Sequence, residues 1–133
     1  MDRILLTQAP LDPAAIERLV SSKERGAVVT FSGVVRDREN GSAISAIVYE
    51  AYDSMAKKEL ERIAASVEKE TGAVVAVHHR VGEVPVGEAS VIVCAASGHR
   101  PEAFSACRLA IDRLKADVPI WKASFTAPVR SPR

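Results

Sequence analysis

The segment that most restricts the fold is residues 94–122, which predicts a strand, a turn, a helix and a second strand in direct succession. The helix is expected to begin at Pro101, because proline fits the first helical position, where its missing N–H and its fixed φ are harmless. We expect it to run to Lys115 and to bury small residues such as Ala103 and Ala110. Its predicted apolar stripe consists of Phe104, Cys107, Ile111 and Leu114.

Basic residues stand at both ends of this predicted helix. His99 and Arg100 precede it, with Arg100 at the predicted N-cap, where Asp, Asn, Ser or Thr is preferred. Two cations beside the positive end of a helix dipole repel it unless they share an anion, so the pair indicates either a phosphate or carboxylate site or two side chains directed into water. Lys115 in the last turn and Lys122 on the following extended segment also have plain interpretations, as a dipole partner and a surface lysine. Lys122 is expected to project opposite Trp121.

The rest of the chain alternates strand and helix patterns. The predicted elements are a strand at Ile4–Thr7, a helix from Asp12-Pro13 to Val20, strands at Ala27–Val35 and Ile44–Tyr52, a helix from Asp53 or Ser54 to Thr71-Gly72, and strands at Val74–Val81 and Ser90–Ala96. Leu60, Ile63, Ala64 and Val67 form the predicted buried face of the second helix.

Three local features refine this prediction. Gly33 predicts a bulge or a close backbone approach within its strand. Asn40-Gly41 is a turn signal, so the strands on either side are expected to pair as one long hairpin, with Arg36 and Arg38 at its base. On the strand that carries His78 and His79, one histidine is expected to face the core and the other the solvent. Residues 82–88 predict a tight connection.

The resulting element order predicts an α+β domain with a largely antiparallel sheet and packed helices. A chain of 133 residues fits one domain, here residues 1–126, followed by a mobile tail at residues 127–133. The formal charge of +1 and the aromatic content of 5% give no support for nucleic-acid binding. We find no signal peptide and no apolar run of membrane-spanning length, which predicts a cytoplasmic protein that does not bind membranes.

The two cysteines, Cys94 and Cys107, have neither redox nor zinc spacing and are expected to be buried free thiols. The histidines have no carboxylate or cysteine companions at ligand spacing, so no metal site is predicted. The chain therefore offers no cysteine nucleophile and no sulfur carrier of its own.

Five stretches together resemble the family of large, catalytic subunits of molybdopterin synthase. They are FSGVVRD at 31–37, YEAYDSMA at 49–56, HRVGEVPVGE at 79–88, SGHRPEAF at 97–104 and LKADVPIWK at 114–122. The resemblance implies an α/β hammerhead-like fold and a sulfurtransferase in molybdenum cofactor biosynthesis. Its substrate would be a cyclic pyranopterin monophosphate, converted to molybdopterin.

The resemblance also implies partners and site residues. Sulfur would come from the C-terminal thiocarboxylate of a small ubiquitin-like subunit, with no permanently bound cofactor. Carried over by motif, Arg36 with the backbone of Val35, His99 and Arg100 would bind the pterin or its phosphate. Lys115 and Lys122 would bind substrate and act at the reacting centre, since a lysine near other cations loses its proton more readily. The chain departs from the family at Ala123-Ser124, where a basic and then an acidic residue is usual.

Helix length predicts the assembly. From Pro101 to Lys115 a helix spans roughly 21 Å, too far for one small pterin to reach both ends. We therefore expect a homodimer whose pockets are completed across the interface, and with the small subunit a heterotetramer. The main alternative is a non-catalytic regulatory module that binds a phosphate ligand at His99 and Arg100; an RNA-binding domain is the third hypothesis.

Overall fold

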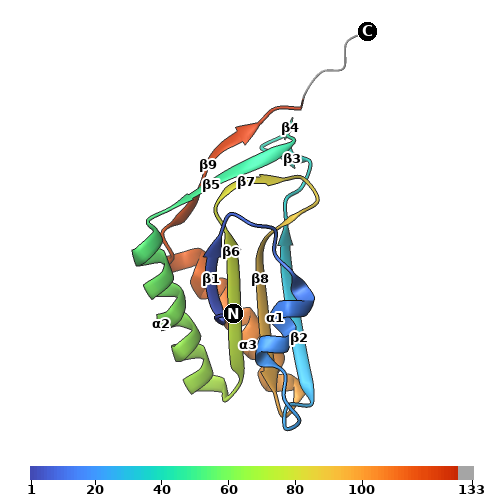
Figure 1. Ribbon diagram of the computed structural model, residues 1–133, viewed down its shortest axis with the longest axis vertical. Helices are drawn as coiled ribbons and strands as arrows, with labels where there is room; N and C mark the ends of the chain where they lie inside the picture. The colour runs from blue at the N-terminus through green and yellow to red at the C-terminus, as the bar shows by residue number, and fades with distance from the viewer. Residues whose placement is uncertain (129–133) are drawn as a thin grey trace.

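The computed structural model describes residues 1–128, which form three helices and nine strands (Figure 1). In chain order these are β1 (Ile4–Thr7), α1 (Pro13–Val20), β2 (Ala27–Val34), β3 (Arg38–Glu39), β4 (Ser42–Ala43), β5 (Ala46–Ala51), α2 (Asp53–Thr71), β6 (Val74–Arg80), β7 (Gly82–Pro85), β8 (Ala89–Ser97), α3 (Arg100–Asp117) and β9 (Ile120–Thr126). Residues 129–133 of the predicted mobile tail lie outside the described residues.

The central sheet has four strands in the order β1-β6-β8-β2. β1 runs parallel to β6, while β6–β8 and β8–β2 are antiparallel, so the predicted α+β class with a largely antiparallel sheet is confirmed. β6 and β8 lie inside the sheet and are buried along nearly their whole length. Their sequences are therefore apolar on both faces rather than alternating.

Helices cover both faces of this sheet. α1 packs on one face, where Ile16 and Val20 contact Ala76 and Ile92. α2 and α3 pack on the other, and Figure 1 shows α1 in front of the strands and α3 behind them. This double cover explains why the prediction for the two histidines was half wrong: both His78 and His79 are buried, since neither face of β6 is open to solvent.

α2 matches its predicted pattern along most of its length. Its predicted apolar face is buried, and the helix ends at Gly72, whose φ of 78° is the left-handed geometry that favours glycine. The helix begins at Asp53, as predicted, but its N-cap is Tyr52, so neither Asp53 nor Ser54 has the capping role that their side chains suit.

α3 lies on the sheet through a row of small residues. The buried positions are Ala103, Ala106, Cys107, Ala110 and Leu114, at the spacing of one helix face. The prediction that Phe104 belongs to the buried stripe was wrong, since Phe104 is 61% exposed. The alanine row lets the helix axis approach the strands closely, and this turns Phe104 to the flank.

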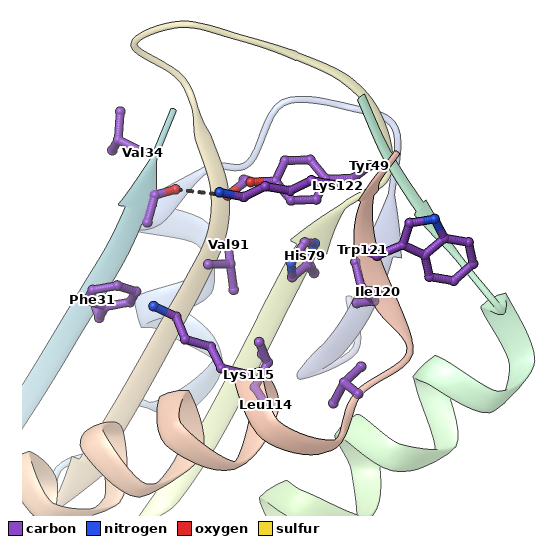
Figure 2. Close-up of a pocket in the computed structure, with 13 residues that line it drawn as sticks. Phe31, Val34, Tyr49, His79, Val91, Leu114, Lys115, Ile120, Trp121 and Lys122 are labelled. Carbon is purple, nitrogen blue, oxygen red and sulfur yellow. Dashed lines mark hydrogen bonds between the residues drawn. The ribbon is translucent and has the colours of Figure 1, made fainter. Parts of the chain in front are cut away.

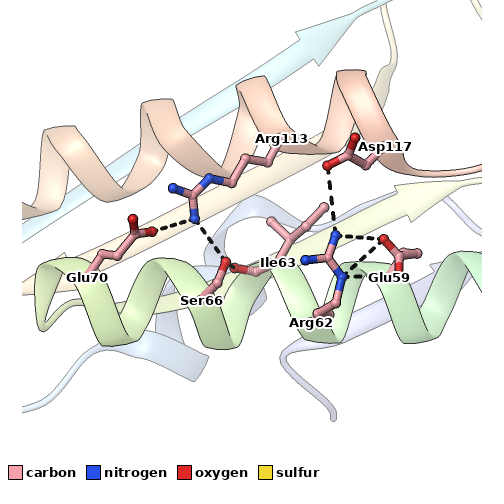
Figure 3. Close-up of polar contacts among 7 residues, drawn as sticks. All are labelled: Glu59, Arg62, Ile63, Ser66, Glu70, Arg113 and Asp117. Carbon is pink, nitrogen blue, oxygen red and sulfur yellow. Dashed lines mark hydrogen bonds and ion pairs between the residues drawn. The ribbon is translucent and has the colours of Figure 1, made fainter.

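Polar side chains join α3 to α2 along their exposed edges (Figure 3). Arg113 pairs with Glu70 and donates to Ser66 at 2.9 Å, and Arg62 pairs with Glu59 and Asp117. Hydrogen bonds from Arg113 and Arg62 lower the pKa of the Glu70 and Glu59 carboxyl groups respectively. Such exposed ion pairs contribute little to the free energy of unfolding. Their main effect is to set the alignment of α2 and α3.

A second sheet, in the order β7-β5-β9, crosses one end of the first. The predicted long hairpin between residues 27–35 and 44–52 was therefore wrong: β2 pairs with β8, and β5 pairs with β7 and β9. The polar loop between them closes on itself as the β3–β4 hairpin, turned at Asn40 and Gly41 with φ of 50° and 79°. The predicted tight connection at residues 82–88 contains β7.

Candidate functional site

A pocket of about 300 Å³ lies where the two sheets meet the last turn of α3. Side chains from β2, β5, β6, β8, α3 and β9 border it, so segments distant in the chain converge there (Figure 2). Its lining residues are Phe31, Gly33, Val34, Tyr49, His79, Ser90, Val91, Leu114, Lys115, Val118, Ile120, Trp121 and Lys122.

Lys115 and Lys122 are the two cations of this pocket. Lys115 extends from α3 and Lys122 from β9, and Figure 2 shows both side chains directed toward β2. The Trp121 ring points to the other side of β9, as predicted, and lies 5.0 Å from the Tyr52 ring. The two lysines therefore share one small cavity although seven positions separate them.

Gly33 shapes the wall of the pocket opposite the lysines. The β2–β8 register shifts between Gly33 and Val34, which confirms the predicted bulge. A Cβ at Gly33 would lie 2.8 Å from Cγ1 of Val91, so a larger residue would force the Val91 side chain to move. The atoms nearest to Gly33 belong to the side chains of Val91 and Phe31, so of the two predicted alternatives the bulge is the one confirmed.

His79 lies at the inner side of the pocket, with only 5% of its surface exposed. Its Nδ1 lies 2.7 Å from the carbonyl oxygen of Arg80; because a carbonyl only accepts, Nδ1 carries the proton. Burial lowers the pKa of His79, partly offset by this hydrogen bond, so the ring is neutral at pH 7. The Tyr49 ring meets it edge-on at 5.5 Å.

Arg36 lies two residues after Val34, which ends β2 and borders the pocket, and it is exposed. Val35 anchors it: its side chain is buried with Ile44 and Val84, its N–H donates to the carbonyl of Glu88 and its own carbonyl accepts from Gly87. The Val35 N–H is therefore already used within the chain.

His99 and Arg100 lie at the opposite end of α3 from Lys115. The prediction that Arg100 is the N-cap was wrong by one residue, since His99 occupies that position without a side-chain capping bond. Both side chains are exposed, and neither borders the pocket of the lysines. One copy of the chain thus does not bring the two predicted basic clusters together.

Cys94 and Cys107 are buried free thiols, as predicted. Burial raises the pKa of both, and with a smaller contribution from Cys94 it raises the pKa of Cys107 to about 11. Both are therefore thiols, not thiolates, at neutral pH. Among residues 1–128 no three His, Cys, Asp or Glu side chains gather as metal ligands would, and none of the helices there has the length and apolar character needed to cross a membrane.

Sequence reasoning did not identify Tyr49 and His79 as pocket residues. The one available signal was that each begins a stretch carrying the family resemblance. It also missed Glu39, whose Oε1 lies 3.1 Å from Nζ of Lys122, because 83 positions separate the pair.

The structure is thus an α+β domain in which two lysines converge on one small pocket, an arrangement whose positive charge suits an anionic group. The MoaE protein family model matches residues 6–117. The molybdopterin synthase catalytic subunit of Nostoc sp. is 43% identical over 123 residues, covering 91% of this chain and 74% of the relative. The chain therefore belongs to the MoaE family of molybdopterin synthase catalytic subunits, which are enzymes of molybdenum cofactor biosynthesis.

Solved structures agree with this assignment. The crystal structure of molybdopterin synthase from Staphylococcus aureus superposes with a TM-score of 0.87 at 29% identity, covering 95% of this chain and 96% of that one. A complex of subunits 1 and 2 of the molybdopterin-converting factor from Helicobacter pylori contains the same fold, with a TM-score of 0.78 at 24% identity, covering 95% and 90% of the two chains.

Proposed function

We propose that this chain converts a cyclic pyranopterin monophosphate to molybdopterin with sulfur from the C-terminal thiocarboxylate of a small ubiquitin-like subunit. The observation that carries the proposal is the convergence of Lys115 and Lys122 on one pocket. The buried thiols of Cys94 and Cys107 are poor sulfur donors, so an external donor accounts for the chemistry. No permanently bound cofactor is part of the proposal.

Each transfer forms a carbon–sulfur bond to the pterin and breaks the carbonyl–sulfur bond of the thiocarboxylate. Water supplies the oxygen of the carboxylate that leaves. Because a dithiolene has two sulfur atoms and each thiocarboxylate carries one, two transfers are needed per product. Negative charge develops at the attacked carbonyl, and ammonium groups already in place stabilise it without reorganisation.

The two lysines have different surroundings and receive different roles. Lys115 has no ion pair or hydrogen-bond partner within residues 1–128, and it stands near another cation; we assign it proton transfer at the reacting centre. Lys122 supplies fixed positive charge. The neutral His79 and the Tyr49 ring form the inner, less polar side of the cavity.

The phosphate of the substrate would bind to Arg36 and to His99 and Arg100 of a second copy of the chain. Val35 contributes by fixing the backbone from which Arg36 projects. α3 separates Arg100 from Lys115 by about 22 Å along its axis, which supports a homodimer with shared pockets. With one small subunit on each copy the assembly is a heterotetramer, and we propose a cytoplasmic location for it.

The test is reconstitution. The purified chain is mixed with a thiocarboxylated small subunit and the cyclic precursor, and dithiolene product is measured by its oxidised fluorescent derivative. Product with the chain and none without it supports the proposal. Binding of the precursor without any product, under conditions where an authentic synthase works, would favour the regulatory module instead.

A further inference from the structure

The β3–β4 hairpin places a carboxylate beside the pocket. Its turn at Asn40 and Gly41 is tight, and Nη1 of Arg38 donates to the Gly41 carbonyl at 3.2 Å. At its base the N–H of Ile44 donates to the carbonyl of Asp37 at 2.9 Å, and Ile44 is buried in the small core of the second sheet. The hairpin is therefore a braced support for Glu39.

Glu39 is largely buried and reaches Lys122. Its side chain is 18% exposed, that of Lys122 is 44% exposed, and Oε1 lies 3.1 Å from Nζ. At this distance Lys122 donates a charge-assisted hydrogen bond to Glu39. The bond uses one of the three N–H donors of the ammonium. Fixing one donor restricts rotation about the last bond of the lysine, so the other two donors have defined directions.

The second pocket lysine lacks such a partner. Lys115 is not paired with any carboxylate within residues 1–128, whereas Lys122 is. The cavity thus contains one ammonium held by a neighbour and one that is not. The paired ammonium of Lys122 is suited to point in one direction. The ammonium of Lys115, unpaired among the described residues, is suited to transfer a proton.

We propose that Glu39 is a positioning residue for the reaction, directing the ammonium of Lys122 at the substrate from the β3–β4 hairpin. The inference rests on the function proposed above. The proposed role of Glu39 has opposite effects on turnover and on substrate binding. Glu39 raises turnover by holding Lys122 in place, and it weakens binding of the anionic substrate by offsetting part of the positive charge around the pocket.

The first test compares Glu39→Gln, Glu39→Asp and a control, Glu50→Gln, with the natural chain. Glu50 is exposed on β5 opposite Trp121, so its substitution changes the net charge equally without touching the pair. We expect Glu39→Gln to lower kcat about tenfold, since a small displacement of a reacting group has effects of this size or larger. Its KM for the pterin should fall about threefold, the effect of removing one repulsive charge at about 6 Å in water.

Glu39→Asp keeps the charge and shortens the reach, so it should restore the natural KM and only part of kcat. Glu50→Gln should leave both constants near the natural values. A Glu39→Gln protein with unchanged constants, or with changes that match those of Glu50→Gln, would overturn the proposal. So would a lower kcat accompanied by an unchanged KM and a lower urea midpoint, which would mark Glu39 as merely structural.

A second readout does not depend on activity. Acylation by an amine-reactive ester, followed by peptide mass spectrometry, gives a rate for each lysine. We expect Glu39→Gln to speed modification of Lys122 several-fold relative to Lys69, an exposed lysine of α2, and Glu50→Gln to leave that ratio unchanged. If the natural chain makes no product but this shift is seen, the pairing stands and the proposed function fails; if Lys122 reacts equally in all variants, the pairing fails.

Discussion

The two ends of α3 present their cations in opposite ways. At the C-terminal end, Leu114 is anchored in the core and Lys115 faces a cavity that it shares with Lys122. At the N-terminal end, His99 and Arg100 are exposed and do not border that cavity. The C-terminal end of α3 therefore has cations inside a cavity, as a reaction site requires. The N-terminal end has cations suited to an anion but no surrounding cavity.

This difference is the reason for our proposal that one copy of the chain holds half of a site. Cations at the positive end of a helix are unfavourable unless an anion or a partner compensates them. Nearby, Phe104 is also exposed beside an apolar groove on α3 and β2. The exposed cations and the exposed Phe104 both lie away from the lysine pocket, and contact with a second copy of the chain would compensate both.

The largest expected effect is at the C-terminal end. Lys115→Ala should reduce kcat by about 10²–10⁴-fold, the usual range for loss of a proton-transfer group. Steady-state kinetics with the thiocarboxylated partner measures it, and Lys69→Ala in α2 serves as a matched control. Turnover within threefold of the natural chain would remove Lys115 from the chemistry.

The anchoring of the two ends should differ in stability. Leu114→Ala leaves a cavity between α3 and the sheet and should lower the free energy of unfolding by about 2–4 kcal/mol. Phe104→Ala removes an exposed side chain and should change it by less than about 0.5 kcal/mol, when measured on isolated monomer. Urea denaturation of both variants tests this contrast, and equal losses would mean that the two ends are packed alike.

At the N-terminal end the expected effect is on binding. Arg100→Ala should raise KM for the pterin phosphate by about 10- to 100-fold, the loss of one charged hydrogen bond, with a smaller change in kcat. Arg108→Ala, an exposed arginine on the same helix, provides the comparison. A loss confined to kcat would place Arg100 at the reacting centre instead.

The smallest effect is a pH dependence at the inner side of the pocket. An unfolded histidine gains a proton near pH 6.5, whereas burial lowers the pKa of His79 and keeps it neutral to lower pH. The unfolded state therefore binds protons first, and the free energy of unfolding should fall as the pH drops below about 6.5, until the folded pKa is reached. Urea midpoints from pH 7.5 to 5 should show this slope, and His79→Gln should flatten it.

Local patterns predicted the elements of this fold better than their pairing. The face of α2, the bulge at Gly33 and the start of α1 at Pro13 follow from short-range periodicity and turn chemistry, and all were confirmed. The predicted pairing of β2 with β5 was wrong. Strands that follow one another in the sequence usually pair as a hairpin, and the observed partners come from distant parts of the chain. The predicted burial of Phe104 was wrong because α3 packs on the sheet through its alanines. A prediction that assigns the buried face from large apolar residues does not detect this packing.

The site divides in the same way. Family motifs supplied Lys115 and Lys122, and the structure brings them to one cavity. The family stretches include Tyr49 and His79, but the position of both beside the lysines, like that of Glu39, results from tertiary contacts between distant segments. The roles of Val35, Arg36, His99 and Arg100 stay predictions, since they depend on a ligand and on a second copy.

Subunit exchange is a direct test of whether two copies of the chain share each pocket. A Lys115→Ala protein and a His99→Ala/Arg100→Ala protein are unfolded together, refolded and assayed at a pterin concentration near the natural KM, where each alone should have little activity. If each pocket takes its lysines from one copy and its His99 and Arg100 from the other, half of the dimers contain one intact pocket, and the mixture should regain about a quarter of natural activity. A mixture no more active than its two components, although exchange is confirmed by mass spectrometry, would contradict shared pockets.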